Sequence, residues 1–450
     1  MMGHRQVEQA ALFYEFSLER HIPADHLLRS IDRFVDLEQV RQDLAPFYSS
    51  IGRPSIDPEL MIRMLLIGYC FGIRSERRLC DEVHLNLAYR WFCRLGLDGA
   101  VPDHSTFSKN RHGRFRQSDL FRRVFESVLR RCIEERLVGG EGFAVDASLI
   151  KADANRQKGI EGDKGLPPEA TGRAIDEYLA VLDDAAFGAA TEVTPKFVSP
   201  SDPAARWTGA HGGQAFFAYS TNYLIDVENA IIVDVEATTA IRQAEVLAAK
   251  RMIERSLERF DLYPGRLLGD SGYGSAEMLA WLVYEHGIEP HVTVFDKSAR
   301  TDGIFARDDF TYDHAGDVYR CPDDKILTTT GTLVNDGATI LYMASKRDCD
   351  RCALKSRCCP TQPSRRLPRS IYEGARDMAR QIARSWEGRT SRRLRKKIEM
   401  LFAHLKRILK LDRLRLRGPN GARDEFTLAA TAQNLRKMAK LIPMPNPKLA

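Results

Sequence analysis

Three acidic residues stand where their carboxylates could do chemistry. Asp146 lies in an apolar stretch, "GFAVDAS", whose alternation predicts a buried strand. Asp270 ends a second apolar run, "GRLLGDSGYGS", and the turn formers behind it predict a tight turn with Ser275 as a helix cap. Glu399 is the single acid in "RLRKKIEMLFAHLKRIL". Taken alone, an Asp at a strand end is more often a turn or cap residue, and Glu399 could simply pair with Arg395.

The three acids indicate a specific chemistry only when they are considered together. Carboxylates that share one cleft repel one another, because like charges a few ångströms apart resist simultaneous ionisation. Divalent cations remove this penalty, and two Mg²⁺ (or Mn²⁺) ions about 3.5–4 Å apart suit such oxygen ligands. Two such ions stabilise the attacking and leaving oxygens of a phosphoryl displacement. The carboxylates of Asp146, Asp270 and Glu399 could therefore act as metal ligands for phosphoryl transfer if they share one cleft.

The first of the elements around this set is helical. Residues 1–135 read as short capped helices, one of which opens with Ser105 as a cap and runs into a basic segment with Lys109 and Arg111. This pattern suits a DNA-contacting domain. A helical domain with a solvated basic face explains it equally well.

Residues 136–297 should contain the sheet that carries both aspartates. The Asp146 strand is followed by two strand candidates, 215–226 and 230–240, which read as a hairpin. A helix, the Asp270 strand, a further helix and a strand at 290–296 complete the order. We expect a mixed α/β sheet with helices on both faces.

Residues 298–369 change to short strands and many cysteines. One Cys-x-x-Cys pair with further thiols nearby has the spacing of a tetrahedral zinc knuckle. The match is partial, because the other thiols are one distant cysteine and one adjacent doublet. Structural Zn²⁺ and simple reduced cysteines are equally consistent with it. The candidate zinc ligands are Cys321, Cys349, Cys352 and one of Cys358 and Cys359.

The last region, residues 370–442, is helical and basic. Its Arg and Lys residues interleave with apolar residues at helical spacing, so a packed helix would present a positive face in a fixed direction. Arg395 and Lys406 lie on the same side of that helix as Glu399.

Composition limits the class of protein. With 450 residues, 44% of them hydrophobic and a net charge of +6, the chain should be globular with two or three domains. The longest apolar run, residues 64–73, is about half of the roughly 20 residues that cross a bilayer. The N-terminus has no apolar signal segment, and nine cysteines favour reduced thiols. We therefore expect a cytoplasmic location and no membrane partner.

In four blocks the sequence resembles the DDE-type transposases of bacterial insertion sequences. The blocks are "SIDPELMIRMLLIGY" with "PDHSTFSKNR", then "AVDASLIKADA", "GDSGYGS" and the final helix. The family pattern Arg-x-x-x-Glu-x-x-x-x-x-x-Lys falls on Arg395, Glu399 and Lys406. One departure is Arg392, which stands where the family commonly has Tyr.

This resemblance implies an RNase H-like mixed sheet flanked by helices, with a helical N-terminal domain and a Cys-containing insertion. It implies that Asp146, Asp270 and Glu399 are the catalytic triad and that Tyr273, Arg395 and Lys406 contact DNA. The glycine-rich turn behind Asp270 would leave room for that DNA. The expected partners are the terminal inverted repeats and target DNA, with a homodimer in the synaptic complex.

The implied function is metal-dependent strand cleavage and strand transfer at the ends of an insertion sequence. One alternative is a nuclease with the same core but no strand transfer. The other is a non-catalytic DNA-binding repressor derived from a transposase. The presence of all three acids in intact motifs argues against the repressor.

Overall fold

The computed structural model forms two compact units, which are described one at a time. Unit 1 comprises Met1–Gly139, Ala147–Asp261 and Ile398–Ala450, and unit 2 comprises Gly140–Asp146 and Leu262–Lys397. The residues that the structure describes are 16–49, 51–52, 55–188, 194–209, 213–295 and 302–444.

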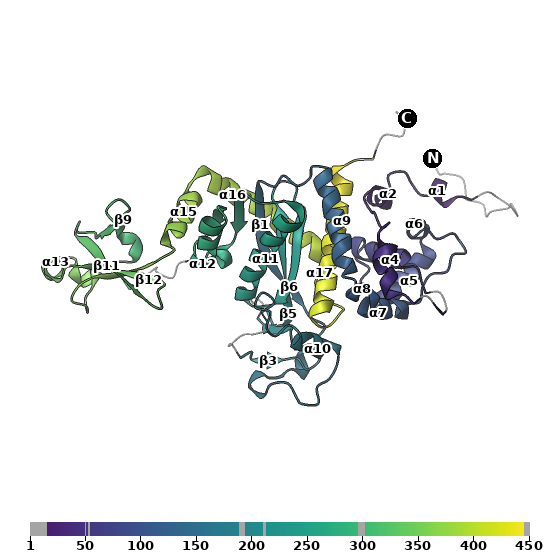
Figure 1. Cartoon of the computed structure of the whole chain (residues 1–450), viewed down its shortest axis with the longest axis horizontal. Helices are drawn as coiled ribbons and strands as arrows, with labels where there is room; N and C mark the ends of the chain where they lie inside the picture. The colour runs from purple at the N-terminus through teal and green to yellow at the C-terminus, as the bar shows by residue number, and fades with distance from the viewer. Residues whose placement is uncertain are drawn as a thin grey trace, which may run out of the picture. The chain divides into compact units, whose positions relative to one another are not determined.

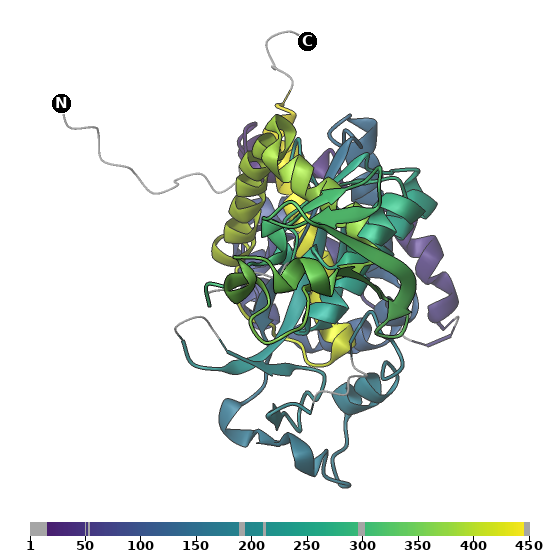
Figure 2. The same cartoon turned by 90° about the vertical axis from the view of Figure 1, so that its left-hand side faces the viewer.

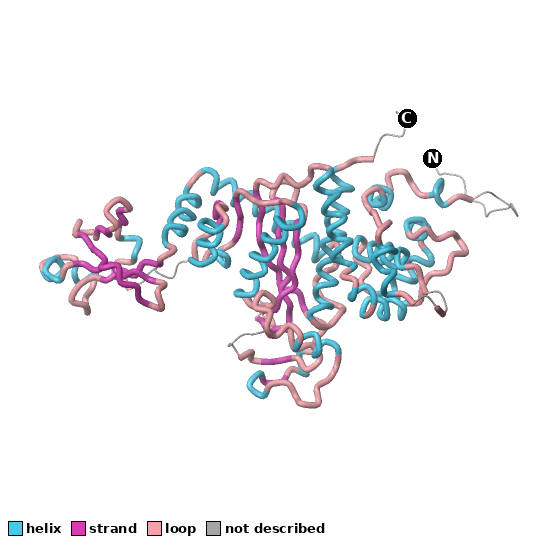
Figure 3. The backbone as a smooth tube through the Cα atoms, viewed as in Figure 1, coloured by secondary structure: helices cyan, strands magenta, loops and turns pink. Residues whose placement is uncertain are grey.

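The N-terminal part of unit 1 is helical, as predicted (Figure 3). One cap differs from the prediction: Asp103, not Ser105, opens α7, because its Oδ1 accepts the N–H of Ser105 at 2.8 Å. Ser105 lies inside the first turn. The helices are α1 (Leu18–His21), α2 (Leu27–Asp32), α3 (Val40–Leu44), α4 (Pro58–Cys70), α5 (Glu76–Leu85), α6 (Leu87–Phe92), α7 (His104–His112), α8 (Arg114–Gln117) and α9 (Leu120–Glu134).

A long C-terminal helix, α17 (Pro419–Leu441), organises the core of unit 1. It packs against α2, α4, α9 and strand β6 (Figure 1). Most of its residues from Pro419 to Leu435 are buried, including the polar residues Glu425 and Asn434. Other elements therefore enclose this part of the helix.

One mixed sheet has the strand order β4-β5-β1-β7-β8, with β6 paired to β5. The predicted hairpin is confirmed, because β5 and β6 pair antiparallel with Tyr223 opposite Val235. Strand β7 runs parallel to both β1 and β8. Helix α11 (Arg242–Phe260) packs against β5 and β6. The strands are β1 (Gly142–Lys151), β4 (Arg206–Thr208), β5 (Phe216–Asp226), β6 (Ile232–Thr239), β7 (Arg266–Gly269) and β8 (Glu289–Val292).

The polar segment behind β1 carries small elements of its own. Strands β2 (Ile160–Glu161) and β3 (Phe197–Val198) pair with each other, and α10 (Arg173–Leu179) lies between them in the sequence.

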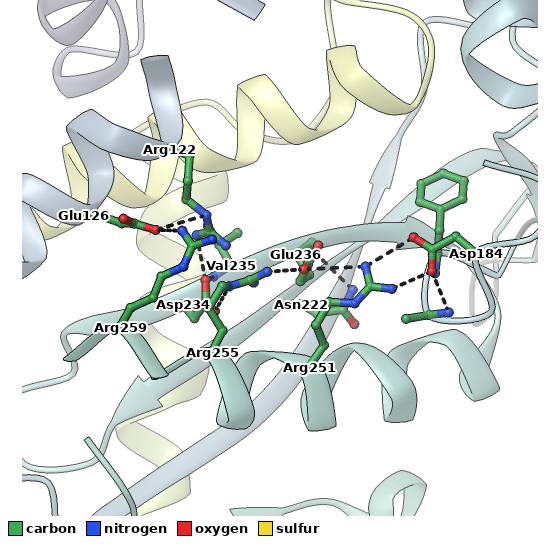
Figure 4. Close-up of polar contacts among 12 residues, drawn as sticks. Arg122, Glu126, Asp184, Asn222, Asp234, Val235, Glu236, Arg251, Arg255 and Arg259 are labelled. Carbon is green, nitrogen blue, oxygen red and sulfur yellow. Dashed lines mark hydrogen bonds and ion pairs between the residues drawn. The ribbon is translucent and has the colours of Figure 1, made fainter. Parts of the chain in front are cut away.

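A network of charged side chains ties β6 to α9 and α11 within unit 1 (Figure 4). Asp234 on β6 accepts Arg122 Nη1 at 2.6 Å and Arg255 Nε at 2.8 Å. Arg255 also donates to Glu236 at 2.8 Å, and its carboxylate neighbours raise its pKa despite burial. Because each acid meets a cation, the network stabilises the fold without leaving an unbalanced charge.

Unit 2 contains a second, antiparallel sheet with the order β13-β12-β11-β10-β9 (Figure 2). Its core is formed by Tyr319, Leu327, Tyr342 and Leu367, with cysteines packed among them. This sheet lies in the segment for which we predicted a Cys-containing insertion. Its elements are β9 (Thr311–Asp313), β10 (Val318–Arg320), β11 (Ile326–Val334), β12 (Thr339–Ala344), α13 (Lys346–Asp350), α14 (Lys355–Cys358) and β13 (Arg366–Ser370).

Helices of unit 2 cover the parallel strands. Helix α15 (Glu373–Arg384) packs against β8 and against α12 (Ala276–Ala280), which continues into a π-helical turn at Trp281–Glu285. Helix α16 (Trp386–Arg407) begins in unit 2 and ends in unit 1. Among the described residues no helix has the length and apolar character that a membrane span requires.

Candidate active site

The pairing of β1 with β7 brings two of the predicted acids to the same height in the sheet. The parallel register pairs Phe143 with Leu267 and Ala144 with Leu268. Continued by two residues, it sets Asp146 opposite Asp270. Neighbouring strands lie about 4.8 Å apart, and residues opposite each other point to the same face. Both aspartates are half-buried, Asp146 within β1 and Asp270 directly after β7, so this continued register would bring the two carboxylates to neighbouring positions.

Asp270 is also a turn residue, as its position at a strand end suggested. Its backbone is extended, and its Oδ1 accepts the N–H of Gly272 at 2.7 Å, which opens a short 3-10 turn at Ser271–Tyr273. In the described residues no ion pair involves Asp270. The cap fixes the direction of the carboxylate without neutralising it. Ser275 caps α12, as predicted, by accepting the N–H of Met278 at 3.2 Å.

At Gly274 the turn behind Asp270 lies against the chain's own backbone. A Cβ on Gly274 would lie 2.1 Å from the carbonyl oxygen of Thr293. The N–H of Phe295 donates to the Gly274 carbonyl at 2.9 Å. The chain's own backbone therefore fills the space. Tyr273, predicted to contact DNA, is buried with 4% of its surface exposed.

The third predicted acid lies on α16. Glu399 is exposed, whereas Ile398, Leu401 and Leu405 are buried and anchor the helix. Lys406 is half-buried, and this burial lowers its pKa. Glu399 belongs to unit 1, and the two aspartates belong to unit 2.

The predicted basic face of α16 is exposed, while Arg395 itself is half-buried. In the N-terminal helices, Lys109 is exposed on α7. Arg111, on the same helix, is buried and pairs with Glu76 at 3.0 Å. The exposed basic residues of α16 are Arg389, Arg392, Arg393, Lys396, Lys397 and Arg407.

The cysteines of the insertion gather in one place. Cys349, Cys358 and Cys359 are buried in its core, and Cys321 packs against them. Burial raises the pKa of Cys358 to about 12, so this thiol is protonated at neutral pH. Cys352 is half-buried, and its Sγ accepts the N–H of Leu354 at 3.4 Å.

Carboxylate oxygens are the ligands that Mg²⁺ prefers, so the Asp146 and Asp270 pair fits such an ion by its chemistry. In the part of the chain that is described, no three His, Cys, Asp or Glu side chains are arranged to hold a metal. The same finding covers the cysteines, for which zinc stays a prediction.

Two parts of the chain match known families. Residues 16–113 match a model described as a transposase domain (DUF772). Residues 320–439, which include Arg395, Glu399 and Lys406, match a transposase DDE domain. Asp146 and Asp270 lie between the two matched ranges.

One solved structure is similar over most of the chain. It is the cryo-EM structure of the piggyBac transposase synaptic complex with hairpin DNA, with 9% sequence identity and a TM-score of 0.33. The similarity covers 94% of this chain and 76% of that one. A TM-score this low supports no conclusion about a shared mechanism.

Proposed function

The chain is a DDE-type transposase, since it carries both a transposase domain and a transposase DDE domain, and we propose that it cleaves DNA and transfers strands by metal-dependent phosphoryl transfer. The DNA would be the ends of an insertion sequence and a target. The observation that supports the proposal is the parallel register of β1 and β7, which pairs Ala144 with Leu268 and, continued by two residues, would set Asp146 opposite Asp270.

Asp146, Asp270 and Glu399 would hold the divalent ions. When bound, Mg²⁺ or Mn²⁺ supplies charge stabilisation to the attacking and leaving oxygens of the phosphate. The Gly272 amide keeps the Asp270 carboxylate in one orientation through a 2.7 Å hydrogen bond. Glu399 is exposed on a helix that its apolar face anchors, and it would complete the ligand set.

The basic residues of α16 would hold the DNA. An acidic cleft repels the phosphate backbone, so cations beside it must supply the attraction. Arg395 and Lys406 would contact phosphates near the scissile bond, and Lys109 would do so from α7. Such contacts position DNA without reading its sequence.

Strand transfer distinguishes this proposal from its two rivals. Hydrolysis and strand transfer differ in whether water or a DNA 3′-hydroxyl attacks. Labelled element ends incubated with a target plasmid in Mg²⁺ should become joined to the plasmid. Cleaved ends without joining would indicate a nuclease, and binding without cleavage would indicate a repressor.

Two further proposals concern assembly and zinc. Synapsis of two element ends calls for at least a homodimer, which mass photometry of the protein with end DNA measures; a complex with one protein chain on two ends would contradict it. Elemental analysis of protein purified without chelator tests zinc at the cysteines. Absence of zinc would end that idea and leave the catalytic proposal intact.

A further inference from the structure

A cavity with both apolar and charged side chains in its lining lies in unit 1, and none of the three predicted acids lines it. It has a volume of about 360 Å³ and is bordered by α4, α5, α7 and the segment before α17. Its charged lining consists of four arginines and two glutamates, so the lining carries an excess of positive charge. These residues are Arg74, Glu76, Arg77, Arg111, Arg415 and Glu425.

Both glutamates are already engaged by the protein. Glu425 is 1% exposed, and its Oε1 accepts the backbone N–H groups of Arg415 and Leu416, each at 2.6 Å. Its Oε2 pairs with Arg74. Glu76 accepts Arg111 Nη2 at 3.0 Å. The acids therefore hold the walls of the cavity in place.

The buried arginines retain unsatisfied donors. The side chains of Arg74 and Arg111 are 5% and 6% exposed. Arg74 Nη1 and Arg111 Nε have no hydrogen-bond partner among the residues that the structure describes. Buried donors without partners are unfavourable and rare in folded proteins. Acceptor oxygens brought by a ligand would satisfy them.

The rim of the cavity adds more donors. Arg77 and Arg415 are exposed, and within the described residues neither takes part in an ion pair. Helix α5, ten residues long, begins here with Ser75 as its cap. Ser75 Oγ accepts the N–H of Arg78. The amides of Glu76 and Arg77 lie in the first turn of the helix, where no preceding turn supplies carbonyl acceptors for them. A helix N-terminus attracts anions.

From these features we propose that the cavity binds a phosphate group, and that DNA supplies it. Arginine forks match the geometry of phosphate oxygens, and the donors come from the cavity floor, its rim and a helix end. DNA as the source rests on the proposed function. The cavity would bind one phosphate of the DNA backbone, while Asp146, Asp270 and Glu399 would act at a different phosphate. Inorganic phosphate and a mononucleotide share this chemistry and serve as probes of the site.

The test uses the full chain and a double variant of the rim, Arg77→Ala with Arg415→Ala. Both side chains are exposed, so the variant should fold, and thermal unfolding checks this. Arg78→Ala is the matched control, because Arg78 is exposed, pairs with Glu82 and does not line the cavity. Binding of inorganic phosphate, a deoxynucleoside monophosphate and an element-end duplex is measured at constant ionic strength in EDTA, so that no cleavage chemistry is needed.

We expect the double variant to bind phosphate and the duplex at least about tenfold more weakly than the Arg78→Ala control. Loss of phosphate and mononucleotide binding with unchanged duplex binding would keep the phosphate site but make a free phosphate ester its ligand. No difference from the control with any probe would overturn the site. The transposase proposal would survive that result, since it depends on cleavage and not on this cavity.

Discussion

Asp234 and Asp270 differ in how the protein surrounds their carboxylates. Asp234 on β6 is buried between two arginines, at 2.6 and 2.8 Å. Asp270, at the end of β7, is half-buried and held by one amide of its own turn at 2.7 Å. A carboxylate whose charge the protein balances serves the fold. One that the protein orients but leaves unbalanced suits a cation that comes from outside.

Asp202 shows a third outcome. It is fully buried, and its Oδ1 accepts the hydroxyl of Tyr219 at 2.5 Å. Burial, opposed by the Tyr219 hydrogen bond, raises its pKa to about 6. A buried carboxylate that no cation balances therefore takes up a proton at a higher pH than an exposed one does.

The largest effect should come from removing charge at the proposed metal site. Asp146→Asn, Asp270→Asn and Glu399→Gln keep side-chain shape but lose a ligand charge, and each should slow strand cleavage at least about a thousandfold. The assay is cleavage of labelled element ends in Mg²⁺. Glu277→Gln and Glu387→Gln, both at exposed acids on α12 and α16, should cleave normally. A near-normal rate in any of the three would remove that residue from the site.

Asp234, whose charge two arginines balance, should affect the stability of the fold and not the rate of cleavage. Arg255→Ala leaves the buried Asp234 and the half-buried Glu236 short of a cation and should lower the free energy of unfolding by about 3 kcal/mol. Urea denaturation measures this loss. Arg242→Ala, at an exposed residue on the same helix, should change stability little. Equal stability of the two variants would mean that the network of Figure 4 contributes no more than surface charge.

Asp202 should make stability depend on pH. Its folded pKa of about 6 lies above the unfolded value of 3.8, so its stabilising contribution is present below pH 3.8 and is lost as the pH rises through 6. This loss amounts to roughly 2–3 kcal/mol. Asp202→Asn should remove it, so that the variant gains relative to wild type between pH 4 and pH 7. Parallel unfolding profiles for the two proteins would contradict the raised pKa.

The smallest expected effect concerns the DNA backbone. Replacing Arg395 and Lys406 by Ala should flatten the dependence of log K on log salt by about 2 and weaken binding to all DNA sequences alike. Met400→Ala, at an exposed uncharged residue of α16, is the control. Loss of discrimination with an unchanged slope would make the two residues base readers. An unchanged slope and affinity would mean that Arg395 and Lys406 do not contact DNA and serve only the structure of the protein.

Local patterns were enough to predict the elements that carry the site. Alternating residues around Asp146, the capped turn after Asp270 and the interleaved basic helix with Glu399 each appear in the structure. The hairpin before α11 was also predictable, because its two strands are separated by a short turn.

Features that depend on packing between distant segments were not predictable. Arg74 and Arg415 line one cavity although they lie 341 positions apart in the sequence. Gly274 looked like an opening for a ligand, but its space is taken by a later strand end. The arginine partners of Asp234 come from α9 and α11, so sequence spacing gave no sign of them.

The central claim is that Asp146 and Asp270 hold a divalent cation together. Electron paramagnetic resonance of Mn²⁺ counts bound ions in the full chain with uncleavable element-end DNA. The account predicts tight Mn²⁺ binding by wild type and Glu277→Gln, and its loss in both Asp146→Asn and Asp270→Asn. Undiminished Mn²⁺ binding by the two aspartate variants would contradict it.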